Sequence, residues 1–489
     1  MTAWRHRLEG MRPVARGVGL LLHVPALMGV ASIPICLVFD EMAGARVLLI
    51  TIGLSTVIAQ VLYWPARRGT QVFRRHAMLI AAISWLLIAC LGAVPFAIGG
   101  GIKWLDAAFE SLSGFTGTGL SVLEPSTLPH YLQWWRSLSQ WIGGVGVIVL
   151  LLSILPPRRG ALELYYSETR DQKILPSVRA TARVIWSVYC SYTLVAVGLL
   201  WLAGEPLWRA LNHGMTGIAT GGFTITDDSF QSASLAVKLV SLLIMTAGAI
   251  SFFVHYRAIQ VKPRAKALFA GAEQRLFWTV LCGGALLLTL DNHALGQSGW
   301  VDSVFQWVSA VTTTGFQSAA LSNWHTGPLL MLCLVMLVGA TAGSTGGGLK
   351  MLRFVLLYKS VRWSLQTFTR RPHEVLRLTF DGQALTREDA ASRTRAVTTL
   401  SIAWMTVSLL AVIIMTHCVA DGVPLQAVVF DVVSAQSNVG LSSGLVDTDL
   451  SASGKLLLMA VMWAGRLEIV PVLVLVALLV RGRTPSVSG

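Results

Sequence analysis

Long apolar runs recur along this chain and limit it to the folds that lipid permits. Each run has about 20 residues, roughly the length of a helix that crosses the hydrocarbon core of a bilayer. The composition agrees, because a chain that is 54% hydrophobic and only 13% charged has too little polar surface for a water-soluble fold. We therefore predict an all-α integral membrane protein with ten transmembrane helices, at about 18–39, 47–63, 77–98, 132–155, 184–203, 235–254, 276–290, 329–357, 397–418 and 456–480.

Lysine and arginine alternate with these runs. The connections on one predicted side carry clusters, at Arg5, Arg7, Arg12 and Arg16, at Arg67, Arg68, Arg74 and Arg75, within 158–183, 257–275 and 350–395, and at Arg481 and Arg483. The opposite connections carry only scattered cations, read as Arg46, Lys103, Arg136, Arg209, Lys238 and Lys455. This alternation follows the positive-inside rule, so the net charge of +14 reflects topology and not a nucleic-acid partner. We expect a multi-pass protein surrounded by membrane lipid, with both termini cytoplasmic.

A short segment occurs four times between these runs. It spans 109–121 and recurs from Asn212, Phe305 and Phe430. Each copy is too short and too polar to cross the membrane, and each lies between two full runs. The predicted unit is helix, re-entrant pore half-helix, extended loop, helix, which is the M1-P-M2 repeat of potassium channels in pseudo-fourfold form. The expected division is 1–75 for an N-terminal helix pair, 76–175, 176–268, 269–375 and 376–489 for the four pore repeats.

The loop of each copy resembles an ion filter. In every copy a glycine is followed by Leu or Phe, as at the start of the Thr-Val-Gly-Tyr-Gly filter of potassium channels. Glycine readily adopts the backbone dihedrals that turn carbonyl groups towards one axis, where they replace the water shell of an ion. We expect a potassium ion as the substrate, with no covalently bound cofactor, at Thr116, Gly117, Thr118, Gly119, Thr220, Gly221, Gly222, Thr313, Thr314, Gly315, Asn438, Val439 and Gly440.

Polar residues accompany each loop in register. Four of them can support the filter from behind, or alternatively satisfy only local backbone: Glu110, His213, Gln306 and Asp431. A hydroxyl also recurs, at Ser113, Thr216, Ser309 and Ser434. Carboxylates just after the loops can concentrate cations at an outer mouth, or alternatively form ordinary solvated loops: Glu124, Asp227, Asp228, Asp447 and Asp449.

Two features interrupt the later apolar runs. The segment 339–350 contains many glycines, each of which weakens a helix by about 1 kcal/mol relative to alanine, so a break is expected there. It differs from a nucleotide P-loop because Leu349 separates Gly348 from Lys350 and no strand precedes it. Arg466 stands near the middle of the last run, where an unpaired charge costs at least ~2.5 kcal/mol. It is a candidate electrostatic barrier, or alternatively one member of a structural ion pair.

These motifs together resemble the Trk/Ktr/HKT superfamily, and the extra N-terminal helix pair resembles its TrkH branch. The resemblance implies potassium uptake across the bacterial cytoplasmic (inner) membrane. It also implies a gate under the filter, formed by an unwound intramembrane loop and a pore arginine, at Gly343, Gly346, Gly347, Gly348, Lys350 and Arg466. It further implies a homodimer resting on cytoplasmic TrkA-like nucleotide-binding regulatory subunits, docked through 362–395, although this segment can equally be a solvated basic linker.

One position departs from the family pattern. Gly117 stands where the family more often has a hydroxyl residue, so the first loop lacks a possible side-chain ligand. A sodium-permeable or ion-coupled monovalent cation transporter of the same fold therefore remains the alternative. An integral-membrane enzyme would need a catalytic constellation, which the sequence does not offer, and neither an enzyme nor a receptor would explain the fourfold glycine pattern.

Overall fold

The computed structural model describes residues 2–67, 72–146, 178–260, 264–369, 379–380, 383–384 and 387–481. The described elements are helices, apart from a two-residue antiparallel pairing of β1 (Thr379–Phe380) with β2 (Gln383–Ala384). The predicted all-α class is therefore confirmed.

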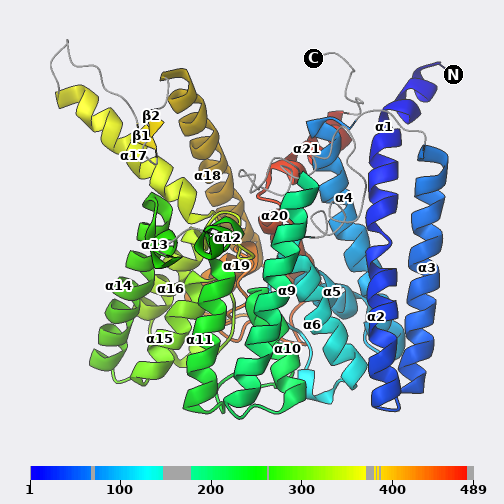
Figure 1. The fold of residues 1–489 in the computed structure, drawn as a ribbon, viewed down its shortest axis with the longest axis horizontal. Helices are drawn as coiled ribbons and strands as arrows, with labels where there is room; N and C mark the ends of the chain where they lie inside the picture. The colour runs from blue at the N-terminus through cyan, green and yellow to red at the C-terminus, as the bar shows by residue number, and fades with distance from the viewer. Residues whose placement is uncertain are drawn as a thin grey trace.

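An N-terminal helix pair stands at one end of the bundle (Figure 1). Helices α1 (Thr2–Leu21) and α2 (Val24–Val38) run on as one span, and α3 (Met42–Ala66) returns against both. Gly19 permits close packing, because a Cβ there would meet the backbone of Ala59 and Tyr63. The carboxylate of Glu41 then caps the next unit, accepting hydrogen bonds from the His130 and Tyr131 backbone N–H groups at 2.9 Å.

Four similar units follow. Their first helices are α4 (Arg74–Gly92, extended by η1, Pro95–Gly99), α9 (Val178–Leu202), α14 (Ala272–Ala294) and α18 (Arg387–Thr416). Their half-helices are α5 (Trp104–Thr116), α10 (Leu207–Ile218), α15 (Trp300–Val311) and α19 (Leu425–Gln436). Each half-helix has 12 or 13 residues, which is about 18–20 Å of helix and too short for the ~30 Å hydrocarbon core. Short turns η2 (Pro125–Thr127) and η3 (Leu321–Asn323) follow two of the loops.

The second helix is interrupted in the second, third and fourth units, and the predicted spans did not include two of these breaks. Helix α11 (Leu235–Ala249) turns by 99° into α12 (Phe252–Gln260), and α20 (Ala452–Arg466) turns by 116° into α21 (Val470–Arg481). In the third unit, α16 (Thr326–Val338) and α17 (Met351–Thr369) are separated by the glycine-rich segment, as the glycine content predicted. In the first unit, α6 (His130–Val145) ends just before the undescribed residues.

Five of the described helices are long and apolar enough to cross a membrane, and up to seven spans result if each bent pair counts as one. The count of ten stays a prediction. Helices α17 and α18 extend beyond the rest of the bundle on the side where α1 begins (Figure 1), and α13 (Arg264–Phe269) precedes α14.

The four units close into a ring. Each second helix packs against the half-helix of the next unit, in the pairs α6 with α10, α11 with α15, α16 with α19, and α20 with α5. A polar contact secures every one of these junctions: Trp208 Nε1 to Gln133 Oε1 (2.8 Å), Lys238 Nζ to Asp302 Oδ1 (2.9 Å), Thr326 Oγ1 to Gln426 Oε1, and Lys455 Nζ to Asp106 Oδ1 (2.7 Å). The cations Lys238 and Lys455 were read as loop residues. Both instead lie in the first turns of helices, where they join neighbouring units.

A candidate ion pathway at the centre of the ring

The four half-helices end in the same way. At each end, the chain leaves the helix with one backbone N–H still bonded to a carbonyl five residues earlier. The distance is 2.9 Å in every unit, for Thr118 N to Ser113 O, Gly221 N to Thr216 O, Thr314 N to Ser309 O, and Val439 N to Ser434 O. The repeat found in the sequence therefore corresponds to a repeated backbone conformation. We call the extended segments that follow strands 1 to 4, comprising 117–119, 220–222, 313–315 and 438–440.

Left-handed residues flank the middle residue of each strand. The first has φ of 65° at Gly117, 49° at Thr220, 55° at Thr313 and 52° at Asn438. The last has φ of 86° at Gly119, 82° at Gly222, 87° at Gly315 and 94° at Gly440. Alternating left- and right-handed residues turn successive peptide dipoles to one side of a strand. This is the geometry that a row of coordinating carbonyls needs.

The last glycine of each strand touches the next strand. A Cβ at Gly119 would collide with the carbonyl oxygen of Gly221, and the same relation holds from Gly222 to Thr314, from Gly315 to Val439 and from Gly440 back to Thr118. The order returns to its start, so the four strands surround one axis. The carbonyls of the four middle residues therefore lie at one level around it.

The four registered polar residues all contact the chain that follows the last glycine of each strand. Glu110 accepts hydrogen bonds from Ser121 Oγ (3.0 and 3.1 Å), His213 Nε2 accepts from Ile225 N (3.4 Å), Gln306 Nε2 donates to Ala319 O (3.2 Å), and Asp431 accepts from Ser442 Oγ (2.8 Å) and Ser443 N (2.7 Å). All four side chains are buried. The structure thus brings each of them behind its own strand.

The registered hydroxyls behave less uniformly. Ser113 Oγ donates to Leu120 O (2.6 Å), and Ser434 Oγ accepts from Gly440 N (3.0 Å), so these two hold their strands. Thr216 bonds to carbonyls of its own helix, Asn212 O and His213 O. Within the described part of the chain, Ser309 Oγ has no hydrogen-bond partner.

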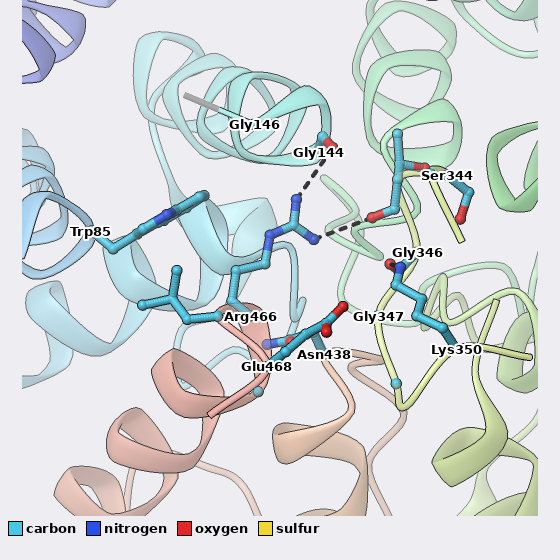
Figure 2. A pocket seen from close by; sticks show the side chains of 15 residues that line it. Trp85, Gly144, Gly146, Ser344, Gly346, Gly347, Lys350, Asn438, Arg466 and Glu468 are labelled. Carbon is cyan, nitrogen blue, oxygen red and sulfur yellow. Dashed lines mark hydrogen bonds between the residues drawn. The ribbon is translucent and has the colours of Figure 1, made fainter. Parts of the chain in front are cut away.

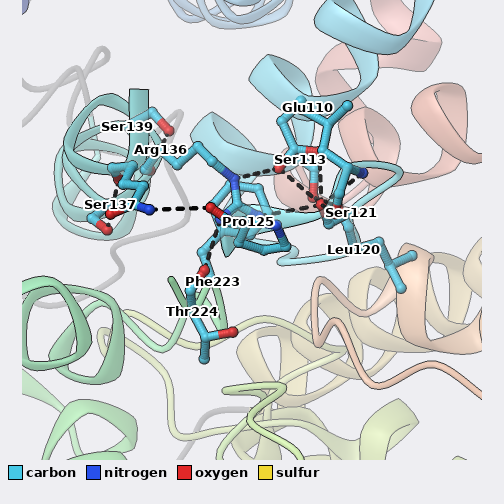
Figure 3. A network of polar contacts seen from close by, with 12 residues as sticks. Glu110, Ser113, Leu120, Ser121, Pro125, Arg136, Ser137, Ser139, Phe223 and Thr224 are labelled. Atoms are coloured by element: carbon cyan, nitrogen blue, oxygen red, sulfur yellow. Dashed lines mark hydrogen bonds and ion pairs between the residues drawn. The ribbon is translucent and has the colours of Figure 1, made fainter. Parts of the chain in front are cut away.

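Arg136 is the supporting residue that the sequence reading missed. It was grouped with loop cations, but it lies in α6 with 1% of its side chain exposed and forms an ion pair with Glu110 (Nε to Oε1, 2.6 Å). Figure 3 shows its guanidinium between Glu110 and Ser121 on one side and Thr224 on the other. The signal was available, because a cation within an apolar run must find a partner or water.

Side chains at the inner ends of the strands meet the glycine-rich segment. Thr220 Oγ1 donates to Thr345 Oγ1 (3.0 Å), and Thr313 Oγ1 accepts from Gly347 N (2.7 Å). Asn438 Nδ2 instead donates to Thr118 Oγ1 and to Met462 O, both at 2.9 Å. Thr116, which was also predicted to bind the ion, is the last residue of α5, directly before strand 1. Its Oγ1 lies 2.7 Å from Thr118 Oγ1.

The segment 339–350 crosses directly beneath strands 3 and 4. A Cβ at Gly346 would meet Thr313 Oγ1, and one at Gly347 would collide with Ser437 O. Neighbouring helices hold the segment, since Thr345 Oγ1 lies 2.9 Å from Gly248 O and Gly343 O accepts from Phe252 N at 3.1 Å. The segment therefore fills the space at the inner ends of the strands.

Arg466 projects from the end of α20 into the same space (Figure 2). Its Nη1 donates to Thr345 O (3.2 Å), and its Nη2 donates to Gly144 O (3.2 Å) and Gly143 O.

A pocket here is lined by Gly343, Gly346, Gly347, Gly348, Lys350, Asn438 and Arg466 together with their neighbours. Glu468 pairs with Arg353, and Lys350 Nζ donates to Gly346 O. The six residues predicted as a gate are therefore adjacent in space.

Gly117 lies beside Arg466. A Cβ at Gly117 would meet nothing nearer than Arg466 Nη1, at 3.8 Å. The missing side chain in strand 1 thus faces a fixed positive charge, whereas the equivalent side chains of strands 2 and 3 face the glycine-rich segment.

The five predicted outer carboxylates lie in the loops after strands 1, 2 and 4. Four of them, Glu124, Asp227, Asp447 and Asp449, are exposed. Asp227 joins two of the loops by accepting hydrogen bonds from Ser126 N (3.0 Å) and Ser126 Oγ. Burial opposes ionisation of Asp228, but hydrogen bonds from Ser232 outweigh it and lower the pKa of this carboxyl below its usual value.

Comparison with known proteins agrees with this architecture. The TrkH family profile, described as a cation transport protein, matches residues 45–483. An uncharacterized cation transporter of Methanocaldococcus jannaschii is 32% identical over 83% of this chain and 82% of its own. The Trk system potassium uptake protein TrkH of Salmonella typhimurium is 31% identical over 95% of this chain and 98% of its own.

A solved structure matches as well. The crystal structure of the potassium transporter TrkH from Vibrio parahaemolyticus superposes with a TM-score of 0.83 at 27% identity, covering 95% of this chain and 98% of that one. The relatives named here are transporters and not enzymes. The ring of half-helices, the broken second helices and these matches along nearly the whole chain agree with one another, and this protein belongs to the TrkH family of cation transport proteins.

Proposed function

We propose that this protein carries potassium across a bacterial cytoplasmic membrane through a selectivity filter formed by strands 1 to 4. The observation that carries the proposal is the closed ring of contacts between each filter glycine and the carbonyl of the next strand. Carbonyl oxygens at one level around an axis can replace the hydration shell of a monovalent cation. The related proteins named as potassium uptake proteins support the choice of ion.

The glycine-rich segment and Arg466 close this pathway on the inner side. A cation that has shed its water would meet a backbone loop seated against strands 2 and 3, and beside it a fixed guanidinium. Both obstacles must move for ions to pass. The pore repeats at 76–175, 176–268, 269–375 and 376–489, after the helix pair at 1–75, describe the units that contribute to the pathway.

Sodium permeation or ion coupling is the second candidate, and Gly117 is the observation that favours it. Strand 1 lacks the side chain that anchors each of the other three strands at its inner end. A less restrained strand would adapt more easily to a smaller ion.

The working assembly that we propose is a homodimer with both termini cytoplasmic, bound to TrkA-like nucleotide-binding subunits. Helices α17 and α18 extend on the side where α1 begins (Figure 1), and the basic segment 362–395 runs from the last turns of α17 into the first turns of α18. Because α17 starts directly after the glycine-rich segment, a partner that moved this helix would pull on the gate.

Flux into vesicles tests the proposal. Purified protein in liposomes, assayed with and without a nucleotide-binding partner, should take up rubidium, a potassium substitute, in preference to sodium. It should also restore growth at low potassium to cells that lack their own uptake systems. Equal rubidium and sodium flux would favour the second candidate, and no flux of either ion under any condition would reject cation transport.

A further inference from the structure

Arg136 contacts the chain just after strand 2 and the residues that hold the chain just after strand 1. Its Nη1 donates to Thr224 O (2.7 Å), two residues after the filter glycine of strand 2, and its guanidinium lies over the Phe223 ring at 4.0 Å. Its Nε and Nη2 contact Glu110 and Ser121, which hold the chain just after strand 1 (Figure 3). One planar, buried cation therefore joins the outer ends of strands 1 and 2.

Among the described residues, the other junctions between strands do not depend on a side chain from a second helix in this way. Strands 2 and 3 are joined by Phe230 N to Gln317 O (2.8 Å), strands 3 and 4 by Gln317 Nε2 to Ser442 O (2.8 Å), and strands 4 and 1 by Asn438 Nδ2 to Thr118 Oγ1 (2.9 Å). At the junction of strands 1 and 2, the buried hydrogen bonds come from α6. Gln140, one turn after Arg136, accepts from Phe223 N at 2.9 Å and donates to Gly221 O.

Strand 1 has particular need of this support. Its first residue is Gly117, so it has no side chain with which to grip the structure beneath it, whereas Thr220, Thr313 and Asn438 do so in the other strands. Thr118 Oγ1 still bonds to Asn438 Nδ2 and Thr116 Oγ1, and the other restraint on strand 1 comes from its outer end, where Glu110 and Arg136 lie.

We infer that Arg136 is a positioning residue of the filter, which fixes the separation of strands 1 and 2 and thereby limits how far the carbonyl ring can contract around an ion smaller than potassium. The inference rests on the proposed function. A smaller ion is coordinated well only if the carbonyls move inward, so a restraint that opposes this movement favours the larger ion.

The ion pair of Arg136 with Glu110 is buried, and this burial decides which variants can be used. Removing Arg136 alone would leave Glu110 as an uncompensated buried charge and threaten folding. Arg136→Lys keeps a positive charge beside Glu110, but an ammonium group cannot act as a planar fork between two strands. Glu110→Gln combined with Arg136→Gln removes both charges together. Lys238→Gln combined with Asp302→Asn is the matched control, because this ion pair also joins a second helix to a half-helix but contacts neither strand 1 nor strand 2.

The test is the ratio of rubidium to sodium uptake by the full-length protein in liposomes. Both Arg136 variants should lower this ratio by about threefold or more, because both lose the fork between the strands. The control variant should keep the wild-type ratio. A wild-type ratio in both Arg136 variants would overturn the inference, and if the double variant does not give a monodisperse protein, Arg136→Lys decides the matter alone. A ratio near one in the wild-type protein would instead overturn the proposed function and the inference with it.

Discussion

Single residues of the four strands must adopt a left-handed backbone conformation and must also leave space for the neighbouring strand. Gly440 has φ of 94°, a conformation that side chains rarely adopt, and a Cβ there would also collide with Thr118 O. Thr220, Thr313 and Asn438 also have positive φ, an arrangement that costs about 1–3 kcal/mol for a residue other than glycine. Their side-chain hydrogen bonds offset part of this cost. The four strands thus form a strained structure that its surroundings hold in place.

Gly440→Ala should reduce the preference for rubidium over sodium. The added Cβ pushes strand 4 away from strand 1 and breaks the carbonyl ring at one of its four junctions. Uptake of the two ions into liposomes measures the effect. Gly53→Ala is the matched control, because it lies in α3 with nothing within 4 Å of the added carbon, and it should leave the ratio unchanged. An unchanged ratio in Gly440→Ala would count against the filter assignment.

The residue set behind the filter was only partly predictable from the sequence. Alignment of the four repeated segments was enough to identify Glu110 and Asp431, because equivalent residues stand at equivalent positions in each copy. Arg136 has no equivalent in the other copies, so the repeat could not reveal it. The reasoning applied to Arg466, that a charge inside an apolar run needs a partner, would have identified Arg136 as well.

At the scale of elements, the second helix of each unit carries the departures from regular structure. The break between α16 and α17 was predictable, because glycine weakens a helix in any setting. The 99° bend between α11 and α12 was not, because it depends on tertiary contacts: Phe252 N bonds to Gly343 O, and Ala249 O accepts from Thr341 Oγ1 (2.8 Å). The glycine-rich segment itself supplies partners for the backbone groups that the bend releases.

Thr345→Val should raise cation flux. The Thr345 hydroxyl lies within hydrogen-bond distance of Ile218 O (3.1 Å) and Gly248 O (2.9 Å) and accepts from Thr220 Oγ1, so valine keeps the shape but loses the anchor of the glycine-rich segment. A net loss of about 1 kcal/mol corresponds to roughly a fivefold shift of the gate towards its open form. Thr406→Val, an exposed residue of α18 that bonds only to its own helix in the described structure, is the control. Flux equal to that of the control would show that this contact does not hold the gate.

Arg466→Ala should also raise flux, because it removes a fixed positive charge and its bonds to Thr345 O and Gly144 O. Flux per protein in liposomes is the measurement. Arg466→Lys should give an intermediate rate, since it keeps the charge but cannot reach three carbonyls at once. A reduced rate in a well-expressed Arg466→Ala protein would indicate a structural role for this residue.

In the whole molecule, one chain builds a closed ring from four similar units. Closure depends on the last unit meeting the first, through α20 and α5. The ion pair of Lys455 with Asp106 (2.7 Å) lies at this junction, with 6% and 17% of the two side chains exposed. The ring could be predicted from the fourfold repeat, but the residues that close it could not, because pairs 349 positions apart leave no local pattern.

Breaking this ion pair should destabilise the protein, and the effects of substituting its two members should not be additive. Lys455→Met and Asp106→Asn should each lower the melting temperature in detergent, because each leaves a partly buried charge without its partner. The double variant should be more stable than the sum of the two losses predicts, with a coupling free energy of about 1–3 kcal/mol. Strictly additive losses would show that the two units are held together at this junction by packing alone.

The central claim is that the carbonyls of Thr118, Gly221, Thr314 and Val439 surround one ion. Anomalous diffraction from crystals grown in rubidium tests it most directly. We expect a rubidium peak on the axis of the ring, at the level of these four oxygens. A rubidium-soaked crystal with no peak on this axis, or with its strongest site elsewhere in the molecule, would contradict it.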